Sequence, residues 1–407
     1  MSSNVSGAAG AVSRRASITG WQIILFATAV GVIVTNLFAP QTLVGLIGPA
    51  FGFGSGMGGL VAMATLLGYA AGLFFLVPLA DLSENRTLVL RMLGCAVLSA
   101  IAAMLAPSAV VLMVILFVLG AACSAIQILV PIAASMVEPE WRGRVIGDVM
   151  SGLMIGILLA RPAASLIADT FGWRAFYGTS ATAMLLLGAV LALRLPRRQP
   201  AGDTGYPALV GSLWGLLRSE SELRRHSLTA SLAMAAFSLF WTSVALRLAE
   251  PPFDLGQRGI ALFALAGAGG AVVTPLFGRA GDRGWTRAGT ILSHCLMILA
   301  FGLSAWAGFA HSGPWLLPLL LLGGSAVLLD IGVTGDQTLG RRVINLLQPE
   351  ARGRLNGLFV GLFFLGGAAG SAMAGVAWAW GGWLTVCAIG VVIAMAALLV
   401  DCLFRAS

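Results

Sequence analysis

Two ionisable side chains lie deep inside apolar segments of the sequence, where a charge rarely persists without a purpose. Arg161 is about 17 residues into one apolar segment and Asp330 about 16 into another, so at about 1.5 Å per residue both are expected near mid-membrane. A carboxylate at that depth can carry a proton, and a guanidinium can pair with it or bind an anionic substrate. A static ion pair, or an arginine that extends back to the membrane surface, is the structural alternative.

The composition explains why these segments are expected to cross a membrane. Of the 407 residues, 58% are hydrophobic and 10% are charged, and the mean hydropathy is +0.95. A soluble domain carries about a quarter charged residues. Apolar runs of about 20 residues fit the hydrocarbon thickness, and lipid requires that their backbone be helical. The sequence therefore predicts an all-α integral membrane protein with twelve transmembrane helices in two pseudo-symmetric six-helix bundles.

The twelve expected spans are separated by charged residues or by Gly and Pro. The first six are expected near residues 20–46, 57–80, 87–106, 108–136, 144–170 and 174–195. The second six are expected near residues 227–249, 257–278, 286–309, 314–339, 352–379 and 381–403.

The segments outside the spans complete the expected organisation. Residues 1–19 and 404–407 are expected as cytoplasmic tails, and residues 20–195 and 227–403 as the two bundles. Residues 196–226 form the most polar stretch and are expected to be a cytoplasmic linker, in which leucines at helical spacing indicate an amphipathic helix.

The distribution of arginine predicts the orientation. With the N-terminus inside, Arg174, Arg247 and Arg258 fall outside, Arg161 lies within a span, and the rest of the 24 basic residues face the cytoplasm. We therefore expect a multi-pass protein of the bacterial inner membrane with both termini cytoplasmic. The net charge of +8 is spread over short loops, so no nucleic-acid partner is expected.

An internal repeat relates the two halves at an offset of 210 residues. The cluster before the fifth span recurs before the eleventh as Pro139, Glu140, Arg142, Gly143, Arg144 and Pro349, Glu350, Arg352, Gly353, Arg354. The same offset relates Gly156 to Gly366, Gly172-Trp173 to Gly382-Trp383, and Gln127 to Gln337. Parallel repeats of this kind build many secondary transporters, in which the site lies between the halves near the midplane.

The turn between the eighth and ninth spans resembles a loop motif of the major facilitator superfamily. Residues 278–287 read GRAGDRGWTR, a glycine followed by an acidic residue and then by basic ones, and the matching loop of the first half keeps Asp81 and Arg86. In that family such loops lock one face of the transporter. The resemblance implies gating residues at these loops and at the repeated cluster, namely Asp81, Arg86, Asp282, Arg283, Arg287, Arg142 and Arg352.

Further segments resemble a bacterial branch of drug and metabolite exporters in the same superfamily. Residues 36–41 (NLFAPQ) are similar to a motif of the first span of that branch, and Asp330, Gly332 and Gln337 are similar to its tenth span. Because spans one, four, seven and ten surround the central cavity in this superfamily, the resemblance implies substrate contacts from polar and aromatic residues on them. These residues are Asn36, Gln41, Gln127, Trp241 and Thr242.

The fifth span is similar to an antiporter motif of the superfamily. Small residues at Gly156, Ala160 and Ala164 allow close helix approach, and Arg161 occupies the place of the motif's proline. We expect Arg161 to bind substrate or to pair with Asp330, the expected proton-coupling residue. Near the end of the tenth span, Asp336 is expected to bond Arg341 or Arg342, and His294 is expected to make a peripheral polar contact.

Proton-coupled efflux of a small drug-like compound or metabolite by an antiporter is the leading functional prediction. Uptake of a small organic anion bound by Arg161 is the alternative. The sequence contains no HExxH helix, GxSxG elbow or GxxxxGK[ST] loop, so no enzyme activity is expected. The expected partners are a small-molecule substrate, protons and the lipid bilayer, and we expect a monomer without metal or organic cofactor.

Overall fold

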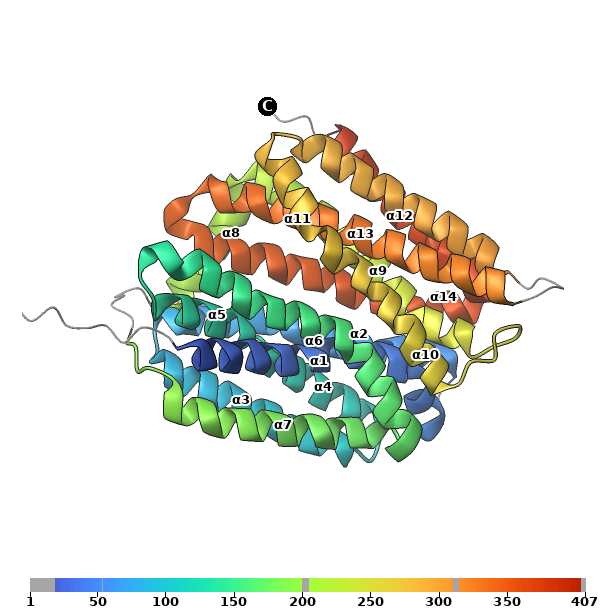
Figure 1. Ribbon diagram of the computed structural model, residues 1–407, viewed down its shortest axis with the longest axis horizontal. Coiled ribbons are helices and arrows are strands. Elements are labelled where there is room, and N and C mark those ends of the chain that lie inside the picture. Colours follow the sequence, from blue (N-terminus) through green and yellow to red (C-terminus); the bar gives the residue numbers. More distant parts are fainter. Residues whose placement is uncertain (1–18, 53, 200–204, 310–314, 404–407) are drawn as a thin grey trace, which may run out of the picture.

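The computed structural model consists of long helices and short connections in the residues it describes, which are 19–52, 54–199, 205–309 and 315–403 (Figure 1). The expected tails therefore lie outside the described residues, apart from Thr19. Thr19 caps the first helix, because its hydroxyl accepts from the Gln22 backbone N–H while the Gln22 side chain accepts from the Thr19 N–H.

The first half of the chain is built from six long helical segments, two of which are flanked by a turn of 3-10 helix. They are α1 (Gly20–Ala50), α2 (Ser55–Phe75), η1 (Val77–Asp81), α3 (Asn85–Met104), α4 (Ala109–Cys123), α5 (Ile126–Ser135), η2 (Pro139–Trp141), α6 (Arg142–Phe171) and α7 (Trp173–Arg194). α4 and α5 follow one another closely and together make one span, Ala109–Ser135.

The second half follows the short helix α8 (Tyr206–Ser219), which lies in the segment expected to hold an amphipathic helix. Its elements are α9 (Ser221–Leu248), α10 (Gln257–Ala264), η3 (Leu265–Gly267), α11 (Ala268–Asp282), α12 (Thr286–Gly308), α13 (Leu316–Leu347), η4 (Pro349–Ala351) and α14 (Arg352–Leu403). We call the end of the molecule that carries α8 the linker face (Figure 1). The first residues of α1 and the last residues of α14 also lie there.

Ten helices among the described residues are long and apolar enough to cross a membrane. The number differs from the twelve expected spans for two physical reasons. α14 has 52 residues, about 78 Å at 1.5 Å per residue, so it is two spans joined at non-helical Gly381 and Gly382. The expected span at 257–278 is helical but is not counted, because the 3-10 turn η3 divides it into α10 and α11, each too short to cross a membrane alone.

The repeated Gly-Trp pair marks equivalent tight turns in the two halves. Gly172 has φ +80° between α6 and α7, and Gly382 has φ +62° inside α14. Residues with a Cβ rarely adopt this backbone conformation, so glycine allows the chain to reverse between adjacent spans with almost no loop. The repeat at this position therefore reflects a backbone requirement.

Close helix contacts through glycine also repeat between the halves. A Cβ at Gly152 or Gly156 of α6 would lie within 3.0 Å of backbone atoms of α1. A Cβ at Gly366 or Gly370 of α14 would lie as close to the backbone of α9. Small residues at these positions let the backbones touch, which is how helices associate in lipid. Each half is thus anchored by its first and fifth spans.

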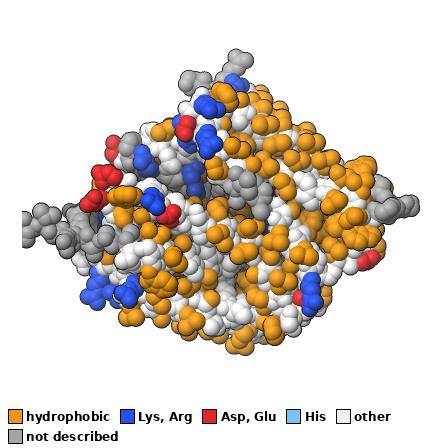
Figure 2. Space-filling model, viewed as in Figure 1, with side chains coloured by type: hydrophobic (Ala, Val, Ile, Leu, Met, Phe, Trp, Pro, Cys, Tyr) orange, Lys and Arg blue, Asp and Glu red, His pale blue; other side chains and the backbone are white. Residues whose placement is uncertain are grey.

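The halves meet along three helix pairs, α2 with α14, α6 with α10 and α1 with α9. The flanks of the molecule carry mainly hydrophobic side chains, and charged side chains gather toward the linker face (Figure 2). This distribution fits a protein whose sides face hydrocarbon and whose ends face water.

The α1–α6 contact gives a test of the packing. Gly156→Ala should lower the thermal denaturation temperature of the purified protein by a few degrees, because overpacking typically costs about 1–3 kcal/mol. Gly188→Ala on α7 is the control, since a Cβ there meets nothing within 4 Å. Equal melting temperatures for the two variants would contradict the close contact.

Candidate functional site

Arg161 is a buried arginine in the middle of α6, with 2% of its surface exposed. Its Nε donates to Gln41 Oε1 of α1 at 3.0 Å, while Nη2 is buried without a hydrogen-bond partner. Both helices contain a proline at this depth, Pro162 and Pro40. Because the bond to Gln41 uses only Nε, the charge of the guanidinium needs further stabilisation.

Aromatic rings supply that stabilisation. The guanidinium carbon of Arg161 lies 5.3 Å from the Phe38 ring centroid, 4.9 Å from that of Phe237 and 4.4 Å from that of Trp241. A desolvated cation over a ring gains about 2 kcal/mol. Phe38 belongs to the half that carries Arg161, whereas Phe237 and Trp241 lie on α9 of the other half. A charge of one half is therefore held by rings of both.

Trp241 also connects Arg161 to Asp330. The indole Nε1 donates to Asp330 Oδ1 of α13 at 2.9 Å, and the same ring lies under the guanidinium. The two charged groups form no ion pair within 4.0 Å, so their opposite charges act on each other across the Trp241 ring. The sequence predicted that Asp330 and Arg161 lie at one depth, but it gave no sign of the bridging role of Trp241.

Arg161 and Asp330 lie at the deep end of a central cavity of about 990 Å³ between the halves. Arg161, Asp330 and Gln127 line it, together with apolar side chains that include Met150, Met154 and Phe364. A cavity of this volume suits a small molecule held by apolar contacts and a few polar groups.

One face of α13 carries the polar lining toward the linker face. Asp330, Thr334, Gln337 and Arg341 recur at helical spacing and all line the cavity. Opposite them, Tyr69 of α2 accepts a hydrogen bond from Gln127 Nε2 at 3.1 Å. Tyr69 and Arg341 were not among the residues expected to line the cavity. Counting helical turns from Asp330 would have found Arg341, whereas nothing local distinguishes Tyr69 from a core aromatic residue.

The cavity opens at the linker face and is closed at the opposite end. Its lining includes Gly147, Gly278 and Asn345, near the linker-face ends of α6, α11 and α13. At the opposite end, Arg258 Nε of α10 contacts Asp169 Oδ2 of α6 at 2.7 Å, which joins the two halves. This ion pair was not expected from the sequence.

The other residues expected to bind substrate divide into two groups. Gln41 accepts a hydrogen bond from Arg161 and the Trp241 ring lies against its guanidinium, but neither residue lines the cavity. Asn36 accepts from Ser180 Oγ at 2.8 Å, and Thr242 lies 3.5 Å from Ser371 Oγ. Both are buried between helices of their own half, so only Gln127 and Arg161 of this set reach the cavity.

The residues expected at the gates make contacts within their own halves. Asp282 Oδ1 accepts from Arg342 at 3.1 Å, Arg352 donates to the Asn345 carbonyl at 3.1 Å, and Arg86 donates to the Ala192 carbonyl. Arg283 lies 5.8 Å from the Trp285 ring centroid. Asp81 and Arg142 are exposed, and Arg287 borders a small pocket beside α9. No described ion pair crosses between the halves at the linker face.

Asp336 departs from expectation. It lies on the face of α13 away from the cavity and contacts His294 Nε2 at 3.1 Å, in place of the expected Arg341 or Arg342. The expectation was wrong because Arg341 and Arg342, five and six residues further along α13, point to other sides of the helix than Asp336. His294 is fully buried, so its contact is not peripheral.

Residues 23–335 match the model of the Major Facilitator Superfamily. The chain belongs to this superfamily of secondary transporters. Its membership accounts for the two bundles, the membrane-spanning helices and the cavity between the halves, and it means that the protein moves a small molecule across a membrane and is not an enzyme.

Relatives and solved structures agree with the superfamily assignment. The Uncharacterized transporter YgaY of Escherichia coli O157:H7 is 36% identical over 383 residues, 93% of this chain and 94% of that protein. The crystal structure of a mutant of the nucleoside transporter NupG superimposes with a TM-score of 0.76 at 14% identity, over 94% of this chain and all of that one. A bacterial homologue of the human lysosomal transporter Spinster, in an inward-facing and occupied conformation, gives 0.69 at 14% identity, over 94% and 96% of the chains. These two likenesses concern the fold.

The hydrogen bond from Trp241 to Asp330 can be tested by a double-mutant cycle. Trp241→Phe keeps a ring under Arg161 but removes the donor, so it should destabilise the otherwise unaltered protein by about 1–3 kcal/mol. In the Asp330→Leu background the same change should cost much less, because the acceptor is already gone. Thermal denaturation of the purified variants measures both. Additive effects would contradict the bond.

Proposed function

We propose that the protein is a proton-coupled exporter of small, partly apolar compounds, in which Asp330 carries the proton and the two halves rock around the central cavity. The observation that carries the proposal is the Arg161–Trp241–Asp330 arrangement at the deep end of the cavity. It places a buried carboxylate next to the substrate space and connects it to a cation of the other half.

Charge balance suggests how a proton would act. Ionised Asp330 offsets the Arg161 charge across the Trp241 ring. Protonation would remove this offset and leave a buried net positive charge at the contact between the halves, where charge is costly. The proton would therefore shift the equilibrium between the two orientations of the halves.

The direction of transport rests on orientation and on the lining. The linker face carries most of the arginines and would be cytoplasmic by the positive-inside rule, with both ends of the chain inside the cell. The cavity would then load from the cytoplasm of a bacterial cell. Its apolar lining and the exporter-like segments around Asn36 and Asp330 favour efflux by antiport.

Uptake of a small organic anion is the second candidate. Arg161 reaches the cavity with a buried Nη2 that lacks a hydrogen-bond partner, and Arg341 also lines the cavity. An anionic group could occupy the position between these cations and be carried together with a proton.

Proton movement in proteoliposomes distinguishes the candidates. With an outward gradient of compounds from a panel of aromatic drug-like molecules and small carboxylates, an antiporter should acidify the lumen and a symporter should make it alkaline. A lumenal pH dye records the sign.

Asp330→Asn should abolish the proton signal while the protein remains folded, because the amide cannot ionise. Asp254→Asn, which changes an exposed carboxylate before α10, should leave the signal unchanged. A proton signal that survives in Asp330→Asn would remove the coupling role from this residue.

The ion pair at the closed end predicts a second effect. Arg258→Glu would place two carboxylates opposite each other and should raise the population open at that end several-fold, since an exposed pair contributes up to about 1 kcal/mol. Access is measured with an impermeant maleimide on a Thr334→Cys variant whose five native cysteines are replaced by serine. Adding Asp169→Arg to Arg258→Glu should restore the original access. Unchanged access in Arg258→Glu would contradict a gating role.

A further inference from the structure

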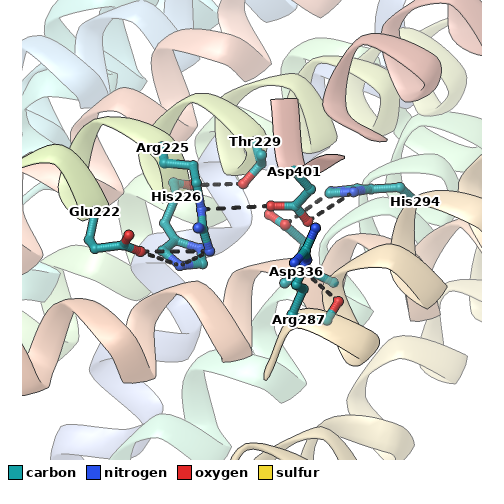
Figure 3. A network of polar contacts seen from close by, with 9 residues as sticks. Glu222, Arg225, His226, Thr229, Arg287, His294, Asp336 and Asp401 are labelled. Carbon is teal, nitrogen blue, oxygen red and sulfur yellow. Dashed lines mark hydrogen bonds and ion pairs between the residues drawn. The ribbon is translucent and has the colours of Figure 1, made fainter. Parts of the chain in front are cut away.

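A second group of buried ionisable residues lies near the linker face of the second half, outside the lining of the central cavity. Figure 3 shows its members converging from four helices: Arg225 of α9, His294 of α12, Asp336 of α13 and Asp401 of α14. His294, Asp336 and Asp401 are 0%, 1% and 2% exposed. Buried charge of this density in a membrane-spanning bundle usually serves a function.

His294 lies between two carboxylates. Its Nε2 is 3.1 Å from Asp336 Oδ1, and its Nδ1 is 3.4 Å from Asp401 Oδ2, although this second contact lacks hydrogen-bond geometry. Asp401 Oδ1 is in turn 3.9 Å from Arg225 Nε. Both ring nitrogens of one buried imidazole therefore face acidic oxygens.

With two ionised carboxylates and a neutral imidazole, this arrangement lacks one proton. A neutral imidazole carries one N–H, so its other nitrogen would present a lone pair to a carboxylate. Two carboxylates and a neutral ring would also leave buried negative charge beyond what Arg225 offsets. An imidazolium has an N–H for each carboxylate and removes both conflicts.

Glu222 weakens the offset that Arg225 gives to Asp401, whereas Arg287 adds a positive charge at the edge of the group (Figure 3). On α9, Glu222 lies 3.6 Å from Arg225 and 3.4 Å from His226 Nε2, so Arg225 is shared between Glu222 and Asp401. Arg287, on the same helix as His294, lies beside the group (Figure 3). The described residues contain no set of three or more His, Cys, Asp or Glu placed to hold a metal, so a proton is the ion that fits.

A pocket of about 370 Å³ at the linker face reaches the edge of the group. Glu222, Arg225 and His226 line it from α9, and Gly284, Thr286 and Arg287 line it from the turn between α11 and α12. Arg225 borders both the pocket and Asp401, so the pocket reaches to within one side chain of the group, and water entering beside Arg225 would carry protons to it.

We propose that His294, Asp336 and Asp401 form a second proton-binding site, separate from Asp330 and supplied through the pocket at Arg225. The bound proton holds α12, α13 and α14 together, because without it two carboxylates and a lone pair would face one another. Since α13 carries Asp330 on one face and Asp336 on another, the state of this site acts on the helix that borders the central cavity.

Nitrogen NMR of the purified full-length protein labelled with ¹⁵N-histidine tests the proposal directly. The chain has three histidines, and His226→Gln and His311→Gln assign their signals. At pH 7.5 the His294 ring should carry protons on both nitrogens, whereas an unperturbed histidine, whose pKa is about 6.5, would be mostly neutral. A neutral His294 ring in the wild-type protein would overturn the proposal without any variant being needed.

Two variants test the roles of the carboxylate and the pocket. Asp401→Asn should convert His294 to the neutral ring with its proton on the nitrogen that faces Asp336, whereas Asp254→Asn should not change it. Val343→Trp, which fills the pocket, should slow exchange of the ring protons with water several-fold. A doubly protonated ring that is indifferent to Asp401→Asn would overturn the site, and unchanged exchange in Val343→Trp would overturn the route. Because none of these readouts uses transport, they are independent of the role of Asp330.

Discussion

Burial of the Arg161 guanidinium at the contact between the two halves is the constraint on which the centre of this structure depends. A charge at mid-membrane costs about 2.5–3.5 kcal/mol even by insertion scales that allow relaxation. Gln41 supplies one hydrogen bond, and the remaining stabilisation comes from three rings and, across Trp241, from Asp330. Two of the rings and the carboxylate belong to the other half, so the halves cannot separate at this depth without exposing the cation to a poorer environment.

The close packing inside each half makes this arrangement usable for motion. Glycine contacts lock α1 to α6 and α9 to α14, so each half can move as a unit. Between the halves, α2 packs closely on α14, while the Arg258–Asp169 pair lies at one end of the contact and the cavity opens at the other. Rigid halves with an adjustable contact are what alternating access requires.

The helix α13 places two buried carboxylates, Asp330 and Asp336, in different surroundings on two of its sides. Asp330 faces the cavity and a tryptophan donor, whereas Asp336 contacts His294, whose other ring nitrogen lies beside Asp401. Both side chains belong to α13, so a change in the charge of either one alters the forces on this helix.

The sequence alone determined the fold class, because apolar runs of span length leave helices as the only structure that satisfies the backbone in lipid. It also determined the repeat, since Gly172 and Gly382 meet the same backbone requirement in each half, and it predicted a common depth for Arg161 and Asp330. Tertiary structure decided which polar residues meet. Trp241 joins Arg161 to Asp330, Asn36 and Thr242 turn away from the cavity, and Asp336 binds His294, which is 42 residues distant in the chain. Helical spacing fixes the direction of a side chain relative to its own helix, but the rotation and neighbours of that helix follow only from the packing of all the spans.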